Sequence, residues 1–247
     1  MIITGDIGNS ETKICLVNNN KIIKKIILNT KLINFNSLKK SLSLLYLNNK
    51  PIKKVIFCSV VPKAFNIIKV FFSRKYNLKT YELKSLNLGS LIKIKVNYKQ
   101  IGSDRLANAI GMLNHKNNFI ILDFGTATTF DVLVKNTYLG GIIAPGIKLS
   151  LNTLINKASL IPKIDLKKTN KVIGLNTINA VRSGFFWGYA GLIDNIINLI
   201  KKETNKSFKI IITGGFANLF RNSISKKVIL NKDITINGLI KASSLIK

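Results

Sequence analysis

One short pattern occurs twice in this chain, and it constrains the fold more than any other feature. Residues 1–17 read MIITGDIGNSETKICLV, and residues 119–134 read FIILDFGTATTFDVLV. Each segment has an apolar strand, the sequence Asp-x-Gly, a hydroxyl-rich turn and a second apolar strand. An ungapped alignment pairs an acid, a glycine, a threonine and a valine: Asp6 with Asp123, Gly8 with Gly125, Thr12 with Thr129, and Val17 with Val134. Because each segment opens about half of the chain, the pattern predicts a duplicated α/β fold with two phosphate-binding turns. Chance similarity between two hairpins is the alternative.

The first of these turns offers several groups that can bind phosphate. Gly8 lets the backbone bend with its amides exposed, and Asn9, Ser10, Thr12 and Lys13 carry hydrogen-bond donors. Asp6 and Asp123 stand at strand ends, where a carboxylate can hold a metal ion or another cation beside phosphates. For either segment taken alone, an ordinary hairpin with a polar turn is the alternative.

Two further glycine clusters lie in the second half of the chain. In KIIITGGFANLF (209–220), a buried strand precedes Gly214 and Gly215, and we expect a helix that begins near Ala217. Paired glycines let a nucleotide approach the N-terminus of such a helix, although no P-loop or complete G-x-G-x-x-G is present. In LGGIIAPGIKLS (139–150), the glycines and the proline predict a rigid irregular loop on the substrate side of the cleft. A plain structural turn is the alternative for both clusters.

The segment DRLANAIGML predicts a helix that begins at Ser103 or Asp104, with its apolar residues on one stripe. Capping of this helix explains Asp104 in the first turn. Capping does not explain Arg105, one of only four arginines in the chain. An acid and an arginine at a helix start suit a general base that takes a hydroxyl proton beside a guanidinium that holds a carboxylate.

The formal net charge of +29 is compatible with nucleic-acid binding, because clustered cations neutralise phosphates. However, only four of the 39 basic residues are arginine, and the lysines are spread along the chain together with many asparagines and isoleucines. This composition indicates codon bias rather than a selected nucleic-acid surface. We therefore expect no specific nucleic-acid partner, while acidic metabolites would still be attracted.

The sequence also bears on location and on the two cysteines. No apolar run reaches the roughly 18 to 20 residues of a membrane span, and the N-terminus lacks the basic leader of a signal peptide. We therefore expect a cytoplasmic protein without a membrane partner. Cys15 and Cys58 lie in apolar strand-like runs without zinc-ligand spacing, which predicts buried structural thiols.

Taken together, the motifs resemble those of the type III pantothenate kinases, a family of the actin-like and sugar-kinase superfamily. The motif order matches over nearly the whole chain: D-x-G-N-[ST]-x-x-K at Asp6–Lys13, G-x-D-R at Gly102–Arg105, D-x-G-T-A-x-T at Asp123–Thr129, and G-G-x-I-x-P-G at Gly140–Gly146. NTINAVRSG, residues 176–184, is a further match. The resemblance implies two ribonuclease-H-like domains, residues 1–117 and 118–247, with mixed sheets flanked by helices and with ATP and pantothenate between them.

The resemblance also implies a reaction, which is the ATP-dependent phosphorylation of pantothenate to 4′-phosphopantothenate, the first step of coenzyme A biosynthesis. Asp104 would be the proton acceptor, Mg²⁺ would accompany ATP, and Asp123 would ligate K⁺ or NH₄⁺. Thr177 would reach the pantothenate pocket across the interface of a homodimer. The implied substrate-binding residues are Gly102, Ser103, Asp104, Arg105 and Thr177, and the implied ATP-binding residues are Asp6, Ile7, Gly8, Asn9, Ser10, Glu11, Thr12, Lys13 and Thr126.

The chain departs from the family pattern just before the G-x-D-R motif. Tyr98 and Gln100 stand where proline and glutamate are expected, and Lys95 stands where the family often has tyrosine. These departures bear on substrate affinity and on the rigidity of the loop. Two alternatives stay open: a same-fold regulatory or binding protein without kinase activity, and a kinase of another small hydroxylated metabolite.

Two smaller features complete the sequence-based expectations. Ala180, Gly184 and Gly188 recur every four residues, which predicts close helix contact at a domain or dimer interface. Packing within one domain is the alternative. We expect His115, the only histidine, to cap or end the helix that begins at Asp104.

Overall fold

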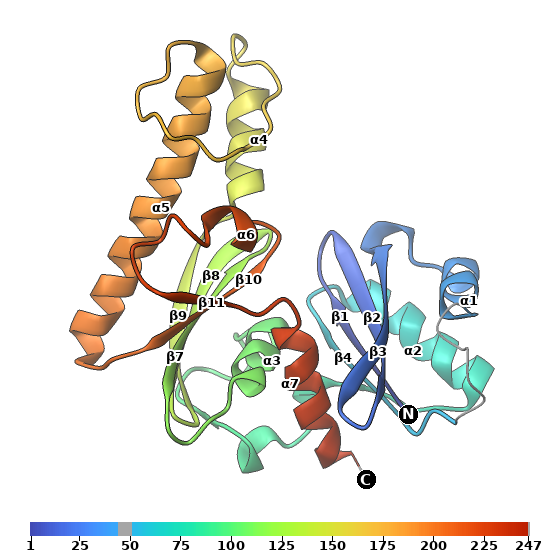
Figure 1. The fold of residues 1–247 in the computed structure, drawn as a ribbon. Coiled ribbons are helices and arrows are strands. Elements are labelled where there is room, and N and C mark those ends of the chain that lie inside the picture. Colours follow the sequence, from blue (N-terminus) through green and yellow to red (C-terminus); the bar gives the residue numbers. More distant parts are fainter. Residues whose placement is uncertain (44–50, 247) are drawn as a thin grey trace. The chain divides into compact units, whose positions relative to one another are not determined.

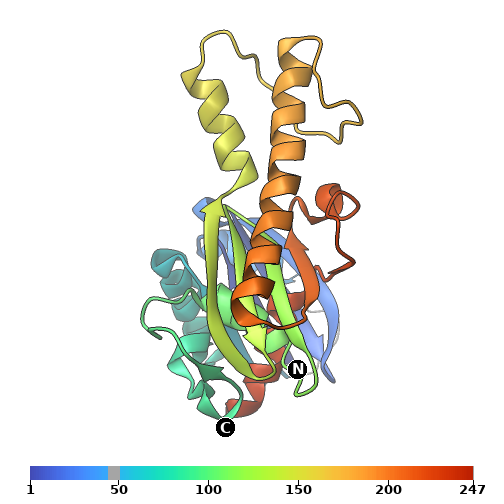
Figure 2. The ribbon, with the colours of Figure 1, turned by 90° about the vertical axis from the view of Figure 1, so that its left-hand side faces the viewer.

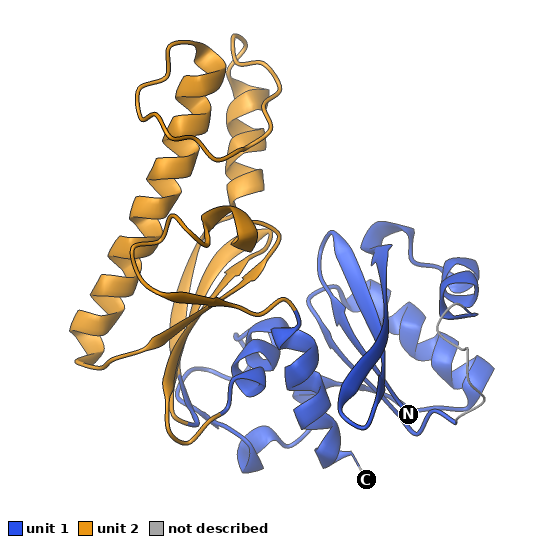
Figure 3. Cartoon of the chain, viewed as in Figure 1, with its two compact units in different colours: residues 1–113, 136–138, 233–247 blue, residues 114–135, 139–232 orange. Residues whose placement is uncertain are grey.

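The computed structural model describes residues 1–43 and 51–246 and divides the chain into two compact units (Figure 3). Unit 1 contains Met1–Leu113, Asn136–Tyr138 and Asp233–Lys247, and unit 2 contains Asn114–Lys135 and Leu139–Lys232. The sequence-based boundary near residue 117 assigned the C-terminal segment to the second half, whereas this segment belongs to unit 1. Among the described residues, no helix combines the length and apolar character that a membrane crossing requires.

Unit 1 is built on a five-stranded sheet with the order β3-β2-β1-β4-β5 (Figure 1). The pairs β1–β2 and β2–β3 are antiparallel, and β4 is parallel to both β1 and β5. The strands are β1 (Ile2–Ile7), β2 (Glu11–Asn18), β3 (Lys21–Asn29), β4 (Lys54–Ser59) and β5 (Thr80–Glu82). The expected strand, turn and strand at the N-terminus are therefore confirmed.

Helices cover both faces of this sheet (Figure 1). Helices α1 (Phe35–Ser43) and α2 (Pro62–Tyr76) bury apolar side chains against the inner strands. Proline at the first position of α2 suits a helix start, where its missing N–H costs no hydrogen bond. On the other face, α3 (Ser103–Gly111) and α7 (Ile234–Ala242) contact the sheet and cross each other closely. A Cβ on Gly238 would lie 1.8 Å from the carbonyl oxygen of Ala107, so only glycine permits this crossing.

A set of short elements links β5 to α3 and closes the C-terminus of unit 1. The two residues of β6 pair in parallel with Thr137 and Tyr138. Between β5 and α3 lie η2 (Leu83–Ser85), η3 (Leu88–Ser90) and β6 (Lys93–Ile94), and η4 (Ser243–Leu245) follows α7. A further short element, η1 (Thr30–Leu32), joins β3 to α1. His115 lies in a turn beyond the end of α3, with Met112 as the C-cap, so the expectation that His115 ends the helix is wrong.

The second sheet has six strands in the order β6-β9-β8-β7-β10-β11, and its strands from β9 to β11 repeat the strand order of unit 1. As in unit 1, an antiparallel hairpin, β7–β8, is followed by strands that run parallel to its first strand. The elements are β7 (Asn118–Phe124), β8 (Ala127–Val134), β9 (Thr137–Pro145), β10 (Lys209–Gly214), β11 (Val228–Leu230), α4 (Ile147–Lys157), α5 (Thr177–Thr204) and α6 (Ala217–Phe220). The predicted duplicated α/β fold is confirmed.

The core of unit 2 lies between its sheet and one face of α5. Phe186, Ala190, Ile193, Ile197 and Ile200 are buried there, at the three- and four-residue spacing of one helical stripe. The N-terminal half of α5 extends beyond the sheet, alongside α4 (Figure 2).

Two sequence-based expectations need correction. The two hairpins differ by one residue: Asp6 pairs with Lys13, whereas Asp123 pairs with Thr129. The ungapped alignment is therefore one position out after the turn. Residues 139–145 are the end of β9 rather than an irregular loop, because glycine also fits a strand, here with Gly140 at φ 138°. The helix predicted to begin near Ala217 is confirmed as α6, which has four residues.

Candidate active site

The first Asp-x-Gly turn joins β1 to β2 with most of its polar groups accessible. Asp6 is half-buried near the end of β1, and the Gly8 amide donates to the Glu11 carbonyl at 3.0 Å. Asn9, Ser10 and Glu11 are exposed, and Lys13 is half-buried. Ile7 and Thr12 are fully buried, so their side chains face the protein interior. The turn thus offers backbone amides and a lysine to an anion.

Thr30, a residue that sequence reasoning missed, holds this turn in place. Its hydroxyl donates to the Gly8 carbonyl at 2.7 Å and lies 2.9 Å from the Thr12 hydroxyl. Its amide donates to the Ser10 carbonyl at 3.0 Å. The sequence around Thr30, LNTKL, carries no motif, because the residue reaches the turn from the end of β3 through the fold.

Cys58 lies beside the acid of the first turn. It pairs with Asp6 across β1 and β4, and its thiol donates to Asp6 Oδ1 at 3.4 Å. Burial is the main reason that the pKa of the Cys58 thiol is raised well above its usual value, and the carboxylates of Asp6 and Asp104 add to the effect. The thiol therefore stays protonated, and both acids lie near it. Cys15 and Cys58 are both buried and free, as predicted.

The G-x-D-R motif forms the start of α3. Gly102 occupies the N-cap position, where it has no side chain to accept a hydrogen bond from the first turn. Asp104 Oδ1 accepts the Arg105 amide at 2.8 Å. Asp104 and Arg105 are half-buried, whereas Ser103 is only 3% exposed and donates its hydroxyl to Glu82. A Cβ on Gly102 would lie 2.5 Å from Asp104 Oδ1, so glycine here leaves room for the carboxylate. The positive end of the helix dipole favours the negative charge of Asp104.

In unit 2, three of the predicted motifs meet at the second Asp-x-Gly turn. A Cβ on Gly146 would lie 2.0 Å from the carbonyl oxygen of Thr126, so the P-G segment packs directly on the turn. Gly214 has φ 87°, and a Cβ there would lie 2.6 Å from both Asp123 Oδ1 and the Phe124 carbonyl oxygen. Thr126 itself is exposed and Asp123 is half-buried. Oxygen atoms of one carboxylate and one carbonyl therefore face the same glycine.

Thr177 stands apart from this cluster, at the end of α5 that extends beyond the sheet (Figure 2). It is the exposed first residue of the helix, and the Asn176 side chain caps the helix by accepting the Asn179 amide at 2.9 Å. Within the described part of the chain, no group of three or more His, Cys, Asp or Glu side chains could hold a metal ion.

The small-residue stripe on α5 faces open space. Added Cβ atoms on Gly184, Gly188 and Gly191 would meet nothing within 4 Å among the described residues. Ala180 is exposed on the same stripe, and Trp187 beside it is 37% exposed. At Gly184 and Gly188 the stripe therefore has no close contact within unit 2, whereas Ala180 packs on Gly174 of the same unit, where an added Cβ would lie 2.2 Å from the Ala180 nitrogen.

Comparison with known proteins gives one consistent family. A family model described as type III pantothenate kinase matches residues 2–199. A type III pantothenate kinase from Pelagibacter ubique (strain HTCC1062) is 74% identical over 248 residues, with full coverage of both chains. One from Jannaschia sp. (strain CCS1) is 40% identical over 191 residues, which cover 76% of this chain and 74% of the relative.

Solved structures agree on the fold. A ROK family glucokinase from Streptomyces griseus, solved with glucose and AMPPNP, superposes with a TM-score of 0.54 at 12% identity. The superposition covers 99% of this chain and 98% of that one. The predicted actin-like and sugar-kinase architecture is thereby confirmed.

Proposed function

This chain belongs to the type III pantothenate kinase family and phosphorylates pantothenate with ATP in coenzyme A biosynthesis, and we propose that Asp104 is the general base of this reaction. The observation that carries the proposal is the position of Asp104 in the first turn of α3. One carboxylate oxygen is held by the Arg105 amide at 2.8 Å, and the side chain stands at the N-terminal end of the helix. An ionised carboxylate can orient the pantothenate hydroxyl and accept its proton as the new phosphate ester forms.

Pantothenate binding is proposed for Gly102, Ser103, Asp104 and Arg105, together with Thr177. The Arg105 guanidinium suits the pantothenate carboxylate, because its two parallel N–H groups match the two carboxylate oxygens. Ser103 directs its hydroxyl to Glu82, so we assign its contribution to the backbone. Arg105→Lys keeps the charge but loses this geometry, so the KM for pantothenate should rise while the KM for ATP stays unchanged.

ATP and a divalent metal ion follow from the kinase family. We assign the phosphates to the exposed turn of Asp6–Lys13 and to Thr126 in the second turn. In the first turn, backbone amides and Lys13 can neutralise the phosphate charge, whereas Ile7 and Thr12 contribute only their backbone because their side chains are buried. Mg²⁺ bound to the nucleotide would reduce charge repulsion in phosphoryl transfer, and the Asp6 carboxylate has the hard oxygen that this ion prefers.

K⁺ or NH₄⁺ is proposed as a further cofactor at Asp123. The support is the donor set: Asp123 Oδ1 and the Phe124 carbonyl oxygen lie on the same side, each 2.6 Å from a Cβ position built on Gly214. Carboxylate and carbonyl oxygens are suitable ligands for a hard monovalent cation.

A homodimer is proposed through the open face of α5. Three glycines there leave room for another helix to approach closely, and Trp187 offers an apolar contact beside them. A partner on this face would also lie near Thr177, at the start of the same helix. Gly188→Trp should convert the dimer to a monomer in light scattering, and a wild-type monomer would overturn the assignment. We also propose that the enzyme acts in the cytoplasm, where it has access to ATP.

The substrate is tested by measuring ADP release from Mg²⁺ and ATP with pantothenate and, in parallel, with glycerol and a panel of sugars. ADP release is expected with pantothenate and with none of the other compounds. Turnover with another hydroxylated compound would point to a kinase with a different substrate. No ADP release with any compound would favour the regulatory alternative.

A further inference from the structure

Glu82, the last residue of β5, and Lys84, in η2, hold the chain on both sides of Gly102. The Glu82 carboxylate accepts the Ser103 hydroxyl through Oε1 and the Lys84 amide, at 2.6 Å, through Oε2. The Lys84 ammonium donates to the Ile101 carbonyl at 2.9 Å and to the Lys99 carbonyl at 3.3 Å. Residues immediately before and after Gly102 are therefore fixed to the same short segment.

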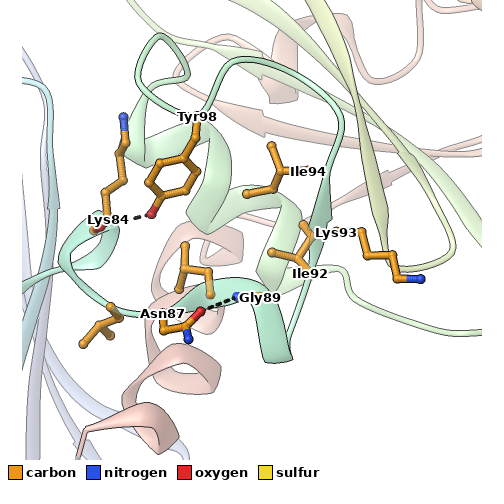
Figure 4. Close-up of a pocket in the computed structure, with 9 residues that line it drawn as sticks. Lys84, Asn87, Gly89, Ile92, Lys93, Ile94 and Tyr98 are labelled. Atoms are coloured by element: carbon orange, nitrogen blue, oxygen red, sulfur yellow. Dashed lines mark hydrogen bonds between the residues drawn. The ribbon is translucent and has the colours of Figure 1, made fainter.

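Tyr98 fixes Lys84 in turn, beside an open hollow of about 590 Å³ that both residues help to line (Figure 4). The Tyr98 hydroxyl donates to the Lys84 carbonyl at 3.0 Å, and the Lys84 ammonium lies 5.2 Å from the centre of the tyrosine ring. Burial, with a smaller effect of the Glu82 charge, raises the pKa of Tyr98, so the phenol remains a donor.

These contacts matter because the start of α3 has little support of its own. Its N-cap is Gly102, which has no side chain to accept the free amides of the first turn. Ser103 is the first helical residue, and Asp104 and Arg105 follow it directly. Hydrogen bonds with a charged partner are stronger than neutral ones, so Glu82 and Lys84 supply two of the strongest restraints on this segment.

We propose that Glu82 and Lys84 form a clamp, with Tyr98 as its support, that positions Gly102–Arg105 for pantothenate phosphorylation. The clamp acts through its contacts with Ile101 and Ser103. The inference rests on the proposed roles of Asp104 and Arg105 and adds the residues that place them. In this arrangement Tyr98, which departs from the family pattern, holds Lys84 in position.

Lys84→Met tests the clamp, because methionine keeps the apolar stem and removes the three donors. The KM for pantothenate should rise about five- to twentyfold, as expected for lost charged hydrogen bonds, while the KM for ATP changes less than about twofold. Lys84→Arg retains donors and should restore most of the wild-type KM. Glu82→Gln should lower kcat about tenfold through misplacement of Asp104. Lys79→Met and Tyr81→Phe are the matched controls, since Lys79 lies 4.9 Å over the Tyr81 ring near the same strand.

Hydrogen exchange provides a reading that does not depend on activity. The Leu106 amide donates to the Gly102 carbonyl at 3.2 Å, and it should exchange faster in Lys84→Met and in Glu82→Gln but not in the controls. Wild-type exchange and kinetics in both variants would overturn the clamp, as would equal rises in the KM for ATP and pantothenate. If the wild-type enzyme did not phosphorylate pantothenate, the substrate assignment would be wrong. The exchange rate of the Leu106 amide in the variants would still show whether Glu82 and Lys84 hold the start of α3.

Discussion

The two Asp-x-Gly turns occupy the same place in two equivalent sheets, yet the protein holds them in different ways. The first turn is held by a side chain, because Thr30 donates to the Gly8 carbonyl and lies beside the Thr12 hydroxyl. The second turn is held by close backbone packing at glycines, since Gly146 and Gly214 leave no room for a Cβ atom. Equal topology therefore does not mean equal tolerance of substitution.

The equivalent threonines show this contrast most directly. Thr12 pairs with Ile7 and Thr128 pairs with Phe124, so each follows its turn at the same position of the ladder. The Thr12 hydroxyl lies 2.9 Å from the Thr30 hydroxyl. The Thr128 hydroxyl is buried without a hydrogen-bond partner among the described residues. We infer that hydroxyls matter structurally at the first turn and glycines at the second.

The largest expected effect concerns Asp104, the acid in the first turn of α3 in unit 1. Asp104→Asn keeps the size of the side chain and an acceptor for the Arg105 amide but removes the base. The kcat should fall by roughly 10² to 10⁴, with the affinity for ATP unchanged in a binding assay. Asp165→Asn, at an exposed acid of unit 2, is the control. Normal turnover with a lower melting temperature would show that Asp104 only supports the helix.

The second effect tests the glycine packing of the second turn. In Gly146→Ala, the new methyl group would sit 2.0 Å from the Thr126 carbonyl oxygen, so backbone must move. The free energy of unfolding of unit 2 should fall by about 1–3 kcal/mol, as for other overpacked sites. Trp187, the single tryptophan, lies in α5 and reports urea unfolding of this unit by fluorescence.

Gly8→Ala is the matched variant of the first turn. Its methyl group would lie 3.2 Å from the Glu11 carbonyl oxygen, a contact that a small shift relieves. The loss of stability should stay below about 1 kcal/mol. Equal losses in Gly146→Ala and Gly8→Ala would contradict the proposed difference between the turns.

The third effect separates the two strand-end acids. If Asp123 ligates a monovalent cation, replacing K⁺ by Na⁺ at matched ionic strength should lower activity about tenfold or more, which corresponds to about 1.4 kcal/mol. Asp123→Asn should have the lower rate in both salts and no longer respond to the change. Equal wild-type rates in K⁺, NH₄⁺ and Na⁺ would remove this role.

The sequence predicted the parts of the site that depend on local chemistry. The Asp-x-Gly turns, the helix start at Ser103 and the buried cysteines follow from turn chemistry and periodicity, and the structure contains them. The sequence did not predict Thr30, Glu82 or Lys84, because these residues reach the motifs through strand pairing and tertiary hydrogen bonds. No local pattern marks a residue whose role depends on a partner about twenty positions away.

The wrong predictions arose from residues that are compatible with more than one local structure. Gly140 and Gly141 predicted a loop, yet they lie in β9, because glycine suits both turns and irregular strand positions. The shorter second turn was invisible to an ungapped alignment, since Thr128 and Thr129 are adjacent and identical. Only the strand register shows which of them matches Thr12.

The smallest expected effect concerns the hydroxyl that holds the first turn. Thr30→Val is nearly isosteric, but it removes the bond to the Gly8 carbonyl and the contact with the Thr12 hydroxyl. Losing such bonds costs about 1 kcal/mol, because buried acceptors remain without a partner. The Gly8 amide should exchange faster, and the KM for ATP should rise a fewfold while the KM for pantothenate is unchanged. Thr128→Val provides the comparison: its hydroxyl has no partner among the described residues, so stability should stay constant or increase. If Thr128→Val destabilised its unit as much as Thr30→Val, hydroxyls would support both turns and the contrast between them would fail.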